Sequence, residues 1–281
     1  MKRSRNRADA TPRGSKAKIA LAVLGVAVLI YGLTAYVLLP RAWTHYEHQK
    51  GLAGLTMVTH TSQGIPGDPI NVGLVGTRKD VLCVMHAAGW YPADPITFRS
   101  SVEIVGSVVL RRPYDDAPVS DLYYDGRRDL AFEKPVGESA DRRHHVRFWE
   151  VLKQGDENRP VWLGSATFDR DVGLSRYTGQ VTHHIGPNVD AERDGLTNDL
   201  KNSKVVEAVY EVSGVGPTFM GRNGEGDRYF TDGEVKISRL VPGCDRKVET
   251  AIELKNPPLV DLKNETWKAL AALLGKGAAA N

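Results

Sequence analysis

Two histidine doublets are the residues of this chain that are best suited to chemistry near neutral pH. His144-His145 lies in the string RRHHVRFW, and His183-His184 lies in GQVTHHIGPNVDAERD. Histidine changes its charge between about pH 5 and 8, so it can act as a general acid or base, and its neutral imidazole can bind a metal ion. The segments around the two doublets are therefore the first candidates for a functional site.

Each doublet lies in a segment with the alternation of a β-strand, where neighbouring side chains point to opposite faces. His145 then shares a face with Arg147, and His184 shares one with Thr182. The second histidine of each doublet therefore has polar company on its face. If the two strands are neighbours in a sheet, these four residues form one polar surface.

Acid–base catalysis and metal binding are two interpretations of this surface. His145 or His184 would act as the general acid or base, with Glu133 or Asp190 orienting the ring. His145, His184 and Asp190 are also the candidate metal ligands. No recognised metal-ligand spacing accompanies them, and adjacent histidines on a strand face opposite ways. The sequence alone does not identify a cofactor.

Ligand binding without catalysis is a third interpretation. Arg147, Thr182 and Arg143 are the candidate ligand-binding residues, and a guanidinium group can bind a phosphate or a carboxylate through two hydrogen bonds. The simplest alternative is that the histidines are ordinary sheet residues. One histidine of each doublet would then be hydrogen-bonded in the core, and the other would face solvent.

The spacing of apolar residues predicts the elements that position these side chains. Strands are expected at 70–75, 143–152, 161–168, 180–185, 205–212 and 233–240. Helices are expected after a capping box at Thr77-Arg78-Lys79-Asp80 and at 100–112, 190–200 and 262–274. Hairpin turns are expected at 125–126, 221–227 and 232–233. The fold class that follows is α+β, with a mostly antiparallel sheet of six or seven strands and flanking helices, preceded by one transmembrane helix.

An apolar segment near the N-terminus indicates a membrane anchor. Ile19–Leu39 holds 21 residues without a formal charge, which is enough to cross a hydrocarbon core of about 30 Å. The tail 1–18 carries seven basic residues and one acidic residue, so the N-terminus is expected in the cytoplasm, with the main domain periplasmic to an inner membrane. A cleaved signal peptide is the alternative, but the apolar run is long for one and lacks a small-x-small cleavage site.

Charge and length limit the class of the remaining chain. The formal net charge of +3 becomes −3 without residues 1–18, because 30 basic and 33 acidic residues then remain. A nucleic-acid-binding surface is therefore not expected. The predicted organisation is a polar neck at 40–66, one domain at 67–258, and a C-terminal helix and tail at 259–281.

The chain has two cysteines, Cys83 and Cys244, which lie far apart in the sequence. In an oxidising periplasm they could form a disulfide that closes a long loop. Alternatively, Cys83 fills a small apolar position in a helix. The sequence alone leaves both interpretations open.

Several strings together resemble one bacterial family, the LssY C-terminal domain family. They are GWYPADPITFRSS, RRPYDDAPVSDLYYDGRRDLAFEKPVG, RRHHVRFWE, WLGSATFDRDVGLS and GQVTHHIGPNVDAERD. The resemblance runs from about Pro69 to about Leu240. Members of this family are often joined to multi-pass membrane modules, so the resemblance implies an envelope setting and a multi-pass membrane protein as a partner. It implies no particular reaction.

The combined prediction is a single-pass protein whose periplasmic domain binds an envelope ligand or a membrane partner. The alternative is a hydrolase of a phosphate-bearing lipid or glycan that uses histidine and carboxylate groups for acid–base or metal chemistry. The expected contacts of the chain are thus the lipid bilayer and a membrane protein, and not nucleic acid.

Overall fold

The computed structural model describes residues 13–42, 49–61, 63–93, 122–124, 130–137, 142–177, 179, 181–212 and 219–278. The chain divides into two compact units, Met1–Thr44 and His45–Asn281, and each is treated by itself. The predicted helix at 100–112 and the predicted hairpin turn at 125–126 lie outside the described residues.

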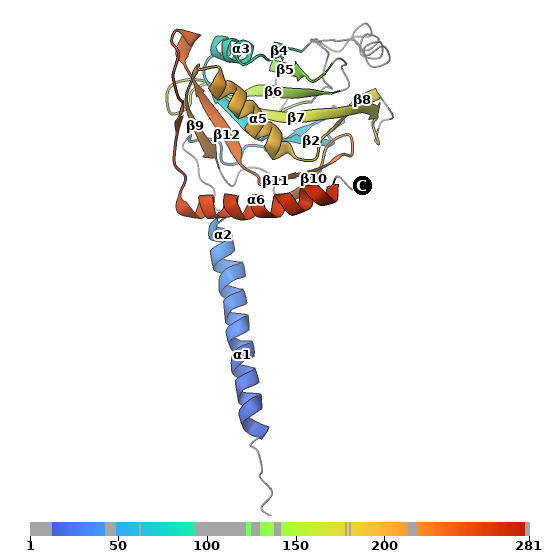
Figure 1. Ribbon diagram of the computed structural model, residues 1–281, viewed down its shortest axis with the longest axis vertical. Helices are drawn as coiled ribbons and strands as arrows, with labels where there is room; N and C mark the ends of the chain where they lie inside the picture. Colours follow the sequence, from blue (N-terminus) through green and yellow to red (C-terminus); the bar gives the residue numbers. More distant parts are fainter. Residues whose placement is uncertain are drawn as a thin grey trace, which may run out of the picture. The chain divides into compact units, whose positions relative to one another are not determined.

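The described part of the first unit, residues 13–42, is a single long helical segment (Figure 1). Helix α1 (Arg13–Leu33) continues through the π-helical turn η1 (Thr34–Leu38) into α2 (Leu39–Ala42). Lys16–Arg41 is long and apolar enough to cross a membrane, and none of its most apolar stretch is buried against protein. The predicted apolar helix at 19–39 is therefore confirmed as a helix.

The second unit is built on one mixed β-sheet. Its strand order is β13-β9-β12-β3-β7-β6-β5-β4, with β8 also paired to β7. The bounds are β3 Val72–Val75, β4 Tyr91–Pro92, β5 Leu130–Pro135, β6 Arg143–Leu152, β7 Val161–Leu174, β8 Val181–Ile185, β9 Val206–Val212, β12 Val235–Leu240 and β13 Ile252–Glu253. Strand β6 has the bounds that its alternation predicted.

The prediction of a mostly antiparallel sheet of six or seven strands was wrong. The described residues form a nine-stranded mixed sheet, in which β12 is parallel to β3 and β13 is parallel to β9. Strands β4 and β13 have two residues each, which is too short for a periodic pattern. The parallel partners are far apart in sequence, and strand alternation carries no information about such pairing.

Two further hairpins lie outside this sheet. Strand β1 (Val58–His60) pairs with β2 (Pro66–Pro69), and β10 (Phe219–Arg222) pairs with β11 (Arg228–Thr231). The glycine-rich run 221–227 forms the β10–β11 turn, as predicted. The prediction of a hairpin turn at 232–233 was wrong. Strands β11 and β12 pair with different strands, and these two residues lie in the link between them.

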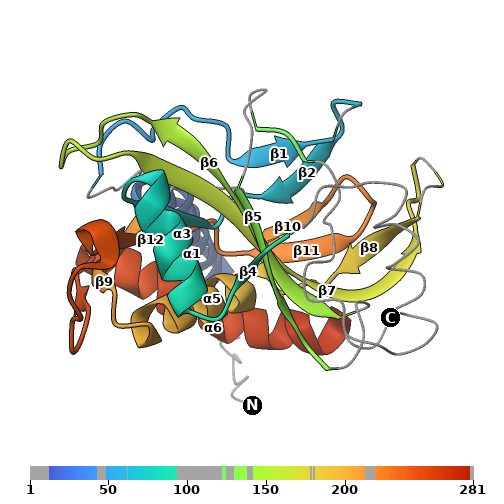
Figure 2. The ribbon, with the colours of Figure 1, turned by 90° about the horizontal axis from the view of Figure 1, so that it is seen from above.

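The two faces of the sheet are covered differently (Figure 2). Helices α3 (Arg78–Ala87) and α5 (Val189–Asn202) lie on one face, where Val84 and Leu196 pack with Phe148 in one apolar core. The β1–β2 and β10–β11 hairpins lie on the other face. There Trp149 and Leu163 belong to a second apolar core, and polar side chains fill the part of the face beside it.

Local signals fix both ends of α3. Thr77 Oγ1 accepts a hydrogen bond from Asp80 N (3.3 Å) and Asp80 Oδ2 accepts one from Thr77 N (2.8 Å), so the predicted capping box is present. Gly89 follows the last turn with φ +77°, a conformation that favours glycine. Cys83 on α3 forms a disulfide with Cys244 in the short helix η2 (Pro242–Cys244). Of the two interpretations of Cys83 that the sequence left open, the structure therefore shows the disulfide.

Candidate functional site

Polar side chains occupy one face of three adjacent strands, β5, β6 and β7. In the antiparallel register His145 lies opposite both Glu133 and Thr167, and Arg143 lies opposite Asp169. All five residues are buried. Buried polar groups are costly unless they are paired, so such a row needs an internal network of contacts.

His145 lies at the centre of that network. Its Nε2 is 2.8 Å from Thr167 Oγ1, and its Nδ1 is 2.9 Å from Asp169 Oδ1. A carboxylate beside one ring nitrogen fixes the orientation of the ring and favours a proton on that nitrogen. The order carboxylate, imidazole, hydroxyl is therefore built across the β6–β7 pair.

Arg143 joins the carboxylates of this network. Its Nη1 donates to Glu133 Oε2 at 2.5 Å, and its Nε donates to Asp169 Oδ2 at 2.9 Å. Its Nη2 lies 3.5 Å from Nδ1 of His183. The side chain of Arg143 is only 2% exposed, so its charge is used to hold Glu133 and Asp169 in place.

A small cavity of about 30 Å³ opens beside His145 and Asp169. Its other polar lining includes Asp68 from β2, Thr182 and His183 from β8, and Asn223 from the β10–β11 turn. Four strands, β2, β6, β7 and β8, and the β10–β11 turn therefore converge here. The volume suits a few water molecules or one small polar group of a larger ligand.

The two aspartates of the cavity have opposite electrostatic environments. Burial raises the pKa of Asp68, although the charge of His145 and the hydrogen bond from Asn223 (3.1 Å) act against it. Burial also tends to raise the pKa of Asp169, but the charges of His145 and His183 hold the pKa of that carboxyl well below its usual range. Two carboxyl groups with diverging pKa values in one site are a recurrent feature of acid–base chemistry.

The structure brings some of the predicted site residues together. His145, Glu133 and Arg143 belong to the network, and Thr182 lines the cavity. Arg147 is buried on the same face of β6, and its charge lowers the pKa of Asp68. These five residues therefore surround one place in the fold.

His184 lies apart from the cavity, and its neighbour His183 lines it instead. The surface predicted for His145 and His184 required β6 and β8 to be neighbours, but β7 lies between them. The β7–β8 register also shifts between Asp169 and Asp171. Such an irregularity changes which side chains of a strand share a face.

His184 connects β8 to the β10–β11 turn. Its Nδ1 lies 3.0 Å from both carboxylate oxygens of Asp227, and Asp227 Oδ2 also accepts a hydrogen bond from Ile185 N. The ring packs over Gly173, where a Cβ atom would lie 2.5 Å from His184 Nε2. His184 therefore helps to hold the turn that carries Asn223 over the cavity.

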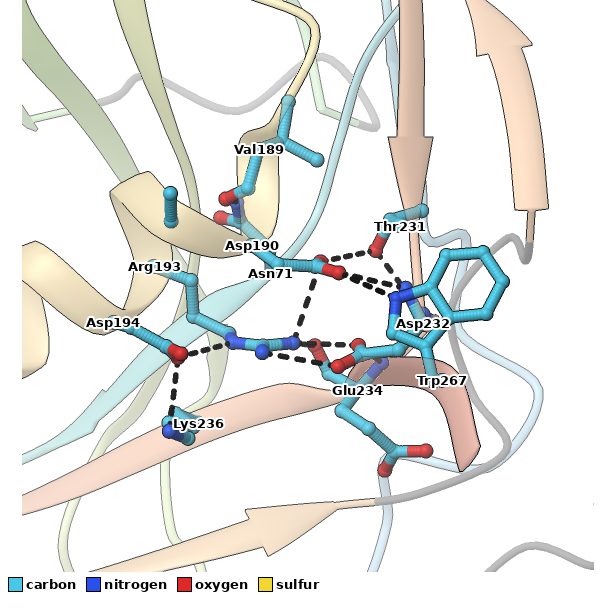
Figure 3. Close-up of polar contacts among 12 residues, drawn as sticks. Asn71, Val189, Asp190, Arg193, Asp194, Thr231, Asp232, Glu234, Lys236 and Trp267 are labelled. Carbon is cyan, nitrogen blue, oxygen red and sulfur yellow. Dashed lines mark hydrogen bonds and ion pairs between the residues drawn. The ribbon is translucent and has the colours of Figure 1, made fainter. Parts of the chain in front are cut away.

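Asp190 belongs to a second polar cluster (Figure 3). It accepts hydrogen bonds from Thr231 Oγ1 (2.7 Å), Asp232 N (2.9 Å) and Trp267 Nε1 (3.1 Å). Beside it, Arg193 forms a two-point ion pair with Asp232, at 2.6 and 3.0 Å. The cluster thus joins α5, the link between β11 and β12, and the C-terminal helix α6 (Pro258–Ala278).

The charges and hydrogen bonds of this second cluster indicate a structural role. Burial raises the pKa of Asp190, although the charge of Arg193 lowers it in part. Burial opposes the charge on Arg193, but Asp232 and Asp190 raise the pKa of its guanidinium above the ordinary value. Both oxygens of Asp190 accept hydrogen bonds. The carboxylate of Asp190 therefore connects three elements of the fold.

The three candidate metal ligands lie in separate clusters. His145 contacts Asp169, His184 contacts Asp227, and Asp190 contacts Arg193. Over the part of the chain that the structure describes, no group of three or more His, Cys, Asp or Glu side chains is arranged to hold a metal ion.

The sequence interpretation missed Asp68, Asp169, His183 and Asn223. Only Asp169 had a usable signal, because Ser165, Thr167 and Asp169 alternate on one face of a strand in which the other face is apolar. Asp68 and Asn223 come from turns and short strands, and only the tertiary fold places them beside His145.

Comparison with known protein families identifies a match over most of the second unit. The family model described as LssY C-terminus matches residues 51–235, which include the whole polar network and both histidine doublets. No curated protein and no solved structure matches the chain. The matched range covers more than half of the chain, and the chain therefore belongs to the LssY C-terminus family.

Proposed function

We propose that this protein is a single-pass membrane protein of the cell envelope, with its second unit outside the cytoplasm. The apolar helix Lys16–Arg41 supports the anchor. The basic residues of the tail 1–18 favour a cytoplasmic N-terminus. The disulfide between Cys83 and Cys244 supports an oxidising compartment for the second unit.

The proposed activity is binding of a hydroxyl- or amine-bearing group of an envelope lipid or glycan in the cavity beside His145. The convergence of Asp68, Asp169, His183 and Thr182 on that cavity carries the proposal. Carboxylates accept hydrogen bonds and attract cations. A hydrogen-bond-donating group therefore matches this lining better than a bare phosphate.

Thermal unfolding of the full chain in phosphatidylcholine nanodiscs tests this function. The probes are ethanolamine, N-acetylglucosamine and inorganic phosphate, each at increasing concentration. A probe that binds only the folded state, at 100 times its Kd, stabilises that state by about 2.7 kcal/mol. Ethanolamine or N-acetylglucosamine should raise Tm, and the two results separate an amine from a glycan ligand.

Two variants show whether the effect comes from the cavity. Asp68→Asn and Thr182→Val should remove the rise in Tm, because both residues line the cavity. Asp171→Asn is the matched control, since the Asp171 side chain is 57% exposed. A rise that persists in both cavity variants, or a Tm that responds to phosphate alone, contradicts the proposed ligand chemistry.

Hydrolysis of a phosphate-bearing lipid or glycan is the second candidate. The observation that favours it is the pair of carboxyl groups beside His145, because the pKa of Asp68 is raised and that of Asp169 is lowered. Asp68 would then protonate the leaving group, and His145, oriented by Asp169, would activate a water molecule that takes the place of the Thr167 hydroxyl at Nε2. This assignment uses only side chains that the structure brings together.

Turnover of chromogenic esters and glycosides separates catalysis from binding. The full chain would be assayed with p-nitrophenyl phosphate, p-nitrophenyl phosphorylcholine and p-nitrophenyl N-acetylglucosaminide. Catalysis predicts a bell-shaped pH dependence and a loss of about 10²-fold or more in Asp68→Asn. A Tm response without turnover of any of the three compounds leaves binding as the function.

A further inference from the structure

Helix α6 has one face that packs on the rest of the second unit, and another, apolar face that is exposed among the described residues. Val260, Lys263 and Trp267 are buried and follow the i, i+3, i+7 spacing of one helix face. Leu259, Leu262 and Leu270 lie on another face, and they are 53%, 59% and 41% exposed. These three leucines form a stripe that nothing in the described chain covers.

Polar contacts fix the orientation of the helix, so the stripe cannot turn inward. Trp267 Nε1 donates to Asp190 at 3.1 Å, and Asn264 Nδ2 donates to Glu211 Oε2 at 2.8 Å. The buried ammonium of Lys263 also forms an ion pair with Glu234. Rolling α6 to bury the leucines would break all three contacts.

Thr266, the polar residue near the stripe, has its hydroxyl already satisfied. Its Oγ1 donates to the carbonyl oxygen of Leu262 within the helix, at 2.8 Å. A threonine that is bonded to its own helix loses no hydrogen bond when it enters an apolar environment. The whole stripe is therefore suited to a contact with hydrocarbon.

The length of the chain argues for the bilayer as the occupant. The apolar helical segment ends at Ala42, and the described part of the second unit begins at Gln49. The six residues between them span at most about 25 Å when fully extended. A membrane crossed by the first segment is thus always within reach of the second unit, which raises the effective concentration of lipid around it.

We propose that α6 lies in the lipid–water interface of the same membrane, with Leu259, Leu262 and Leu270 inserted among the acyl chains. This inference rests on the proposed membrane anchor. The exposed charges of this part of α6 are those of Asp261, Glu265 and Lys268, two acidic residues and one basic residue, so this part of the helix has no excess of positive charge. The contact is therefore apolar, and it requires no anionic lipid.

Depth-dependent quenching of a fluorophore on α6 tests this contact. The full chain with Leu262→Cys is labelled with an NBD maleimide and reconstituted in phosphatidylcholine vesicles with or without doxyl-labelled lipid. Lys268→Cys is the control, because Lys268 is exposed about 120° around the helix from Leu262. Doxyl lipid should quench the probe at 262 roughly twofold more than the probe at 268, as expected for an apolar face inserted about 5–10 Å.

Three other outcomes overturn the inference. Equal quenching and water-like emission at both positions show that α6 does not touch lipid. Blue-shifted emission at 262 that doxyl lipid does not quench shows that protein, such as a second copy of this chain, covers the stripe. Release of the chain from the vesicles by alkaline carbonate instead shows that the anchor itself fails, and both proposals then fall.

Discussion

Asp169 holds His145 and Arg143 together, with one carboxylate oxygen for each. Oδ1 lies 2.9 Å from His145 Nδ1, and Oδ2 accepts a hydrogen bond from Arg143 Nε at 2.9 Å. All three side chains are buried. One carboxylate therefore neutralises the arginine and orients the imidazole of the candidate site.

Replacing this carboxylate by an amide should destabilise the fold. Asp169→Asn leaves Arg143 with a weaker counter-charge in a buried site, and breaking such a pair costs about 3–5 kcal/mol. The exposed Asp171→Asn should change stability by less than about 0.5 kcal/mol. Urea unfolding of both variants measures the difference. Equal stabilities would show that the Asp169 contacts do not support the fold.

Replacing Asp68 by asparagine should have the opposite effect on the stability of the fold at neutral pH. Burial raises the folded-state pKa of Asp68. The charged carboxylate therefore destabilises the folded state above that pKa. This destabilisation disappears as the pH falls to the unfolded-state pKa near 3.9. Asp68→Asn should therefore be at least as stable as the parent chain at about pH 7, with an advantage that disappears at about pH 4.

Unfolding curves at the two pH values check this dependence. The parent chain at each pH is the reference, and the Tm response to the probes is measured on the same samples. A variant that gains stability but loses the ligand response is the pattern expected of a functional residue. A variant less stable than the parent at neutral pH would instead place Asp68 among the structural residues.

The elements of this fold were predictable where local patterns suffice. Thr77 and Asp80 form the predicted capping box, and the bounds of β6 follow from its alternation. The parallel pairing of β3 with β12 joins segments that are more than 150 residues apart. No local signal encodes that partner, so the mixed character of the sheet could not be derived.

The candidate site was predictable only in part, for the same reason. His145 and Glu133 were identified from their residue types, and they lie opposite each other on neighbouring strands. Asp190 was proposed to orient a histidine because it follows the second doublet closely in sequence. It starts a helix that carries it into a different cluster, with Arg193 and Trp267.

That structural role of Asp190 can be tested by an isosteric change. Trp267 Nε1 and Asp232 N both donate to Asp190 Oδ2, and an asparagine NH₂ at that place would face two donors. In the other amide orientation, the NH₂ would face Arg193. Asp190→Asn should therefore cost about 2–3 kcal/mol, as expected when buried hydrogen bonds are lost.

Stability and ligand response, measured together, decide between the two roles of Asp190. The variant should unfold at a lower urea concentration while its folded fraction keeps the Tm response to the probes. Asp171→Asn, whose side chain is 57% exposed and lies outside this cluster, is the control. If Asp190→Asn kept its stability but lost the Tm response to the probes, the result would favour the catalytic role that the sequence suggested.

The disulfide should contribute a large share of the stability of the second unit. Cys83 and Cys244 are separated by 161 positions, and closing a loop of that length contributes roughly 3–5 kcal/mol in the chain-entropy description. Cys83→Ala combined with Cys244→Ala should lose this amount. Reductant should destabilise the parent chain to the same extent and leave the double variant unchanged. A parent chain that is indifferent to reductant contradicts the bridge.

The adjacent residues His183 and His184 give the sharpest test of the site itself. Strand alternation assigns His184 to the functional face, whereas the fold places His183 against the cavity and His184 against Asp227. His184→Ala should lower stability by about 1–2 kcal/mol through the lost carboxylate contact and keep the Tm response to ethanolamine or N-acetylglucosamine. His183→Ala should lose that response. The reverse pattern would mean that His184 contacts the ligand and that the cavity beside His145 does not bind it.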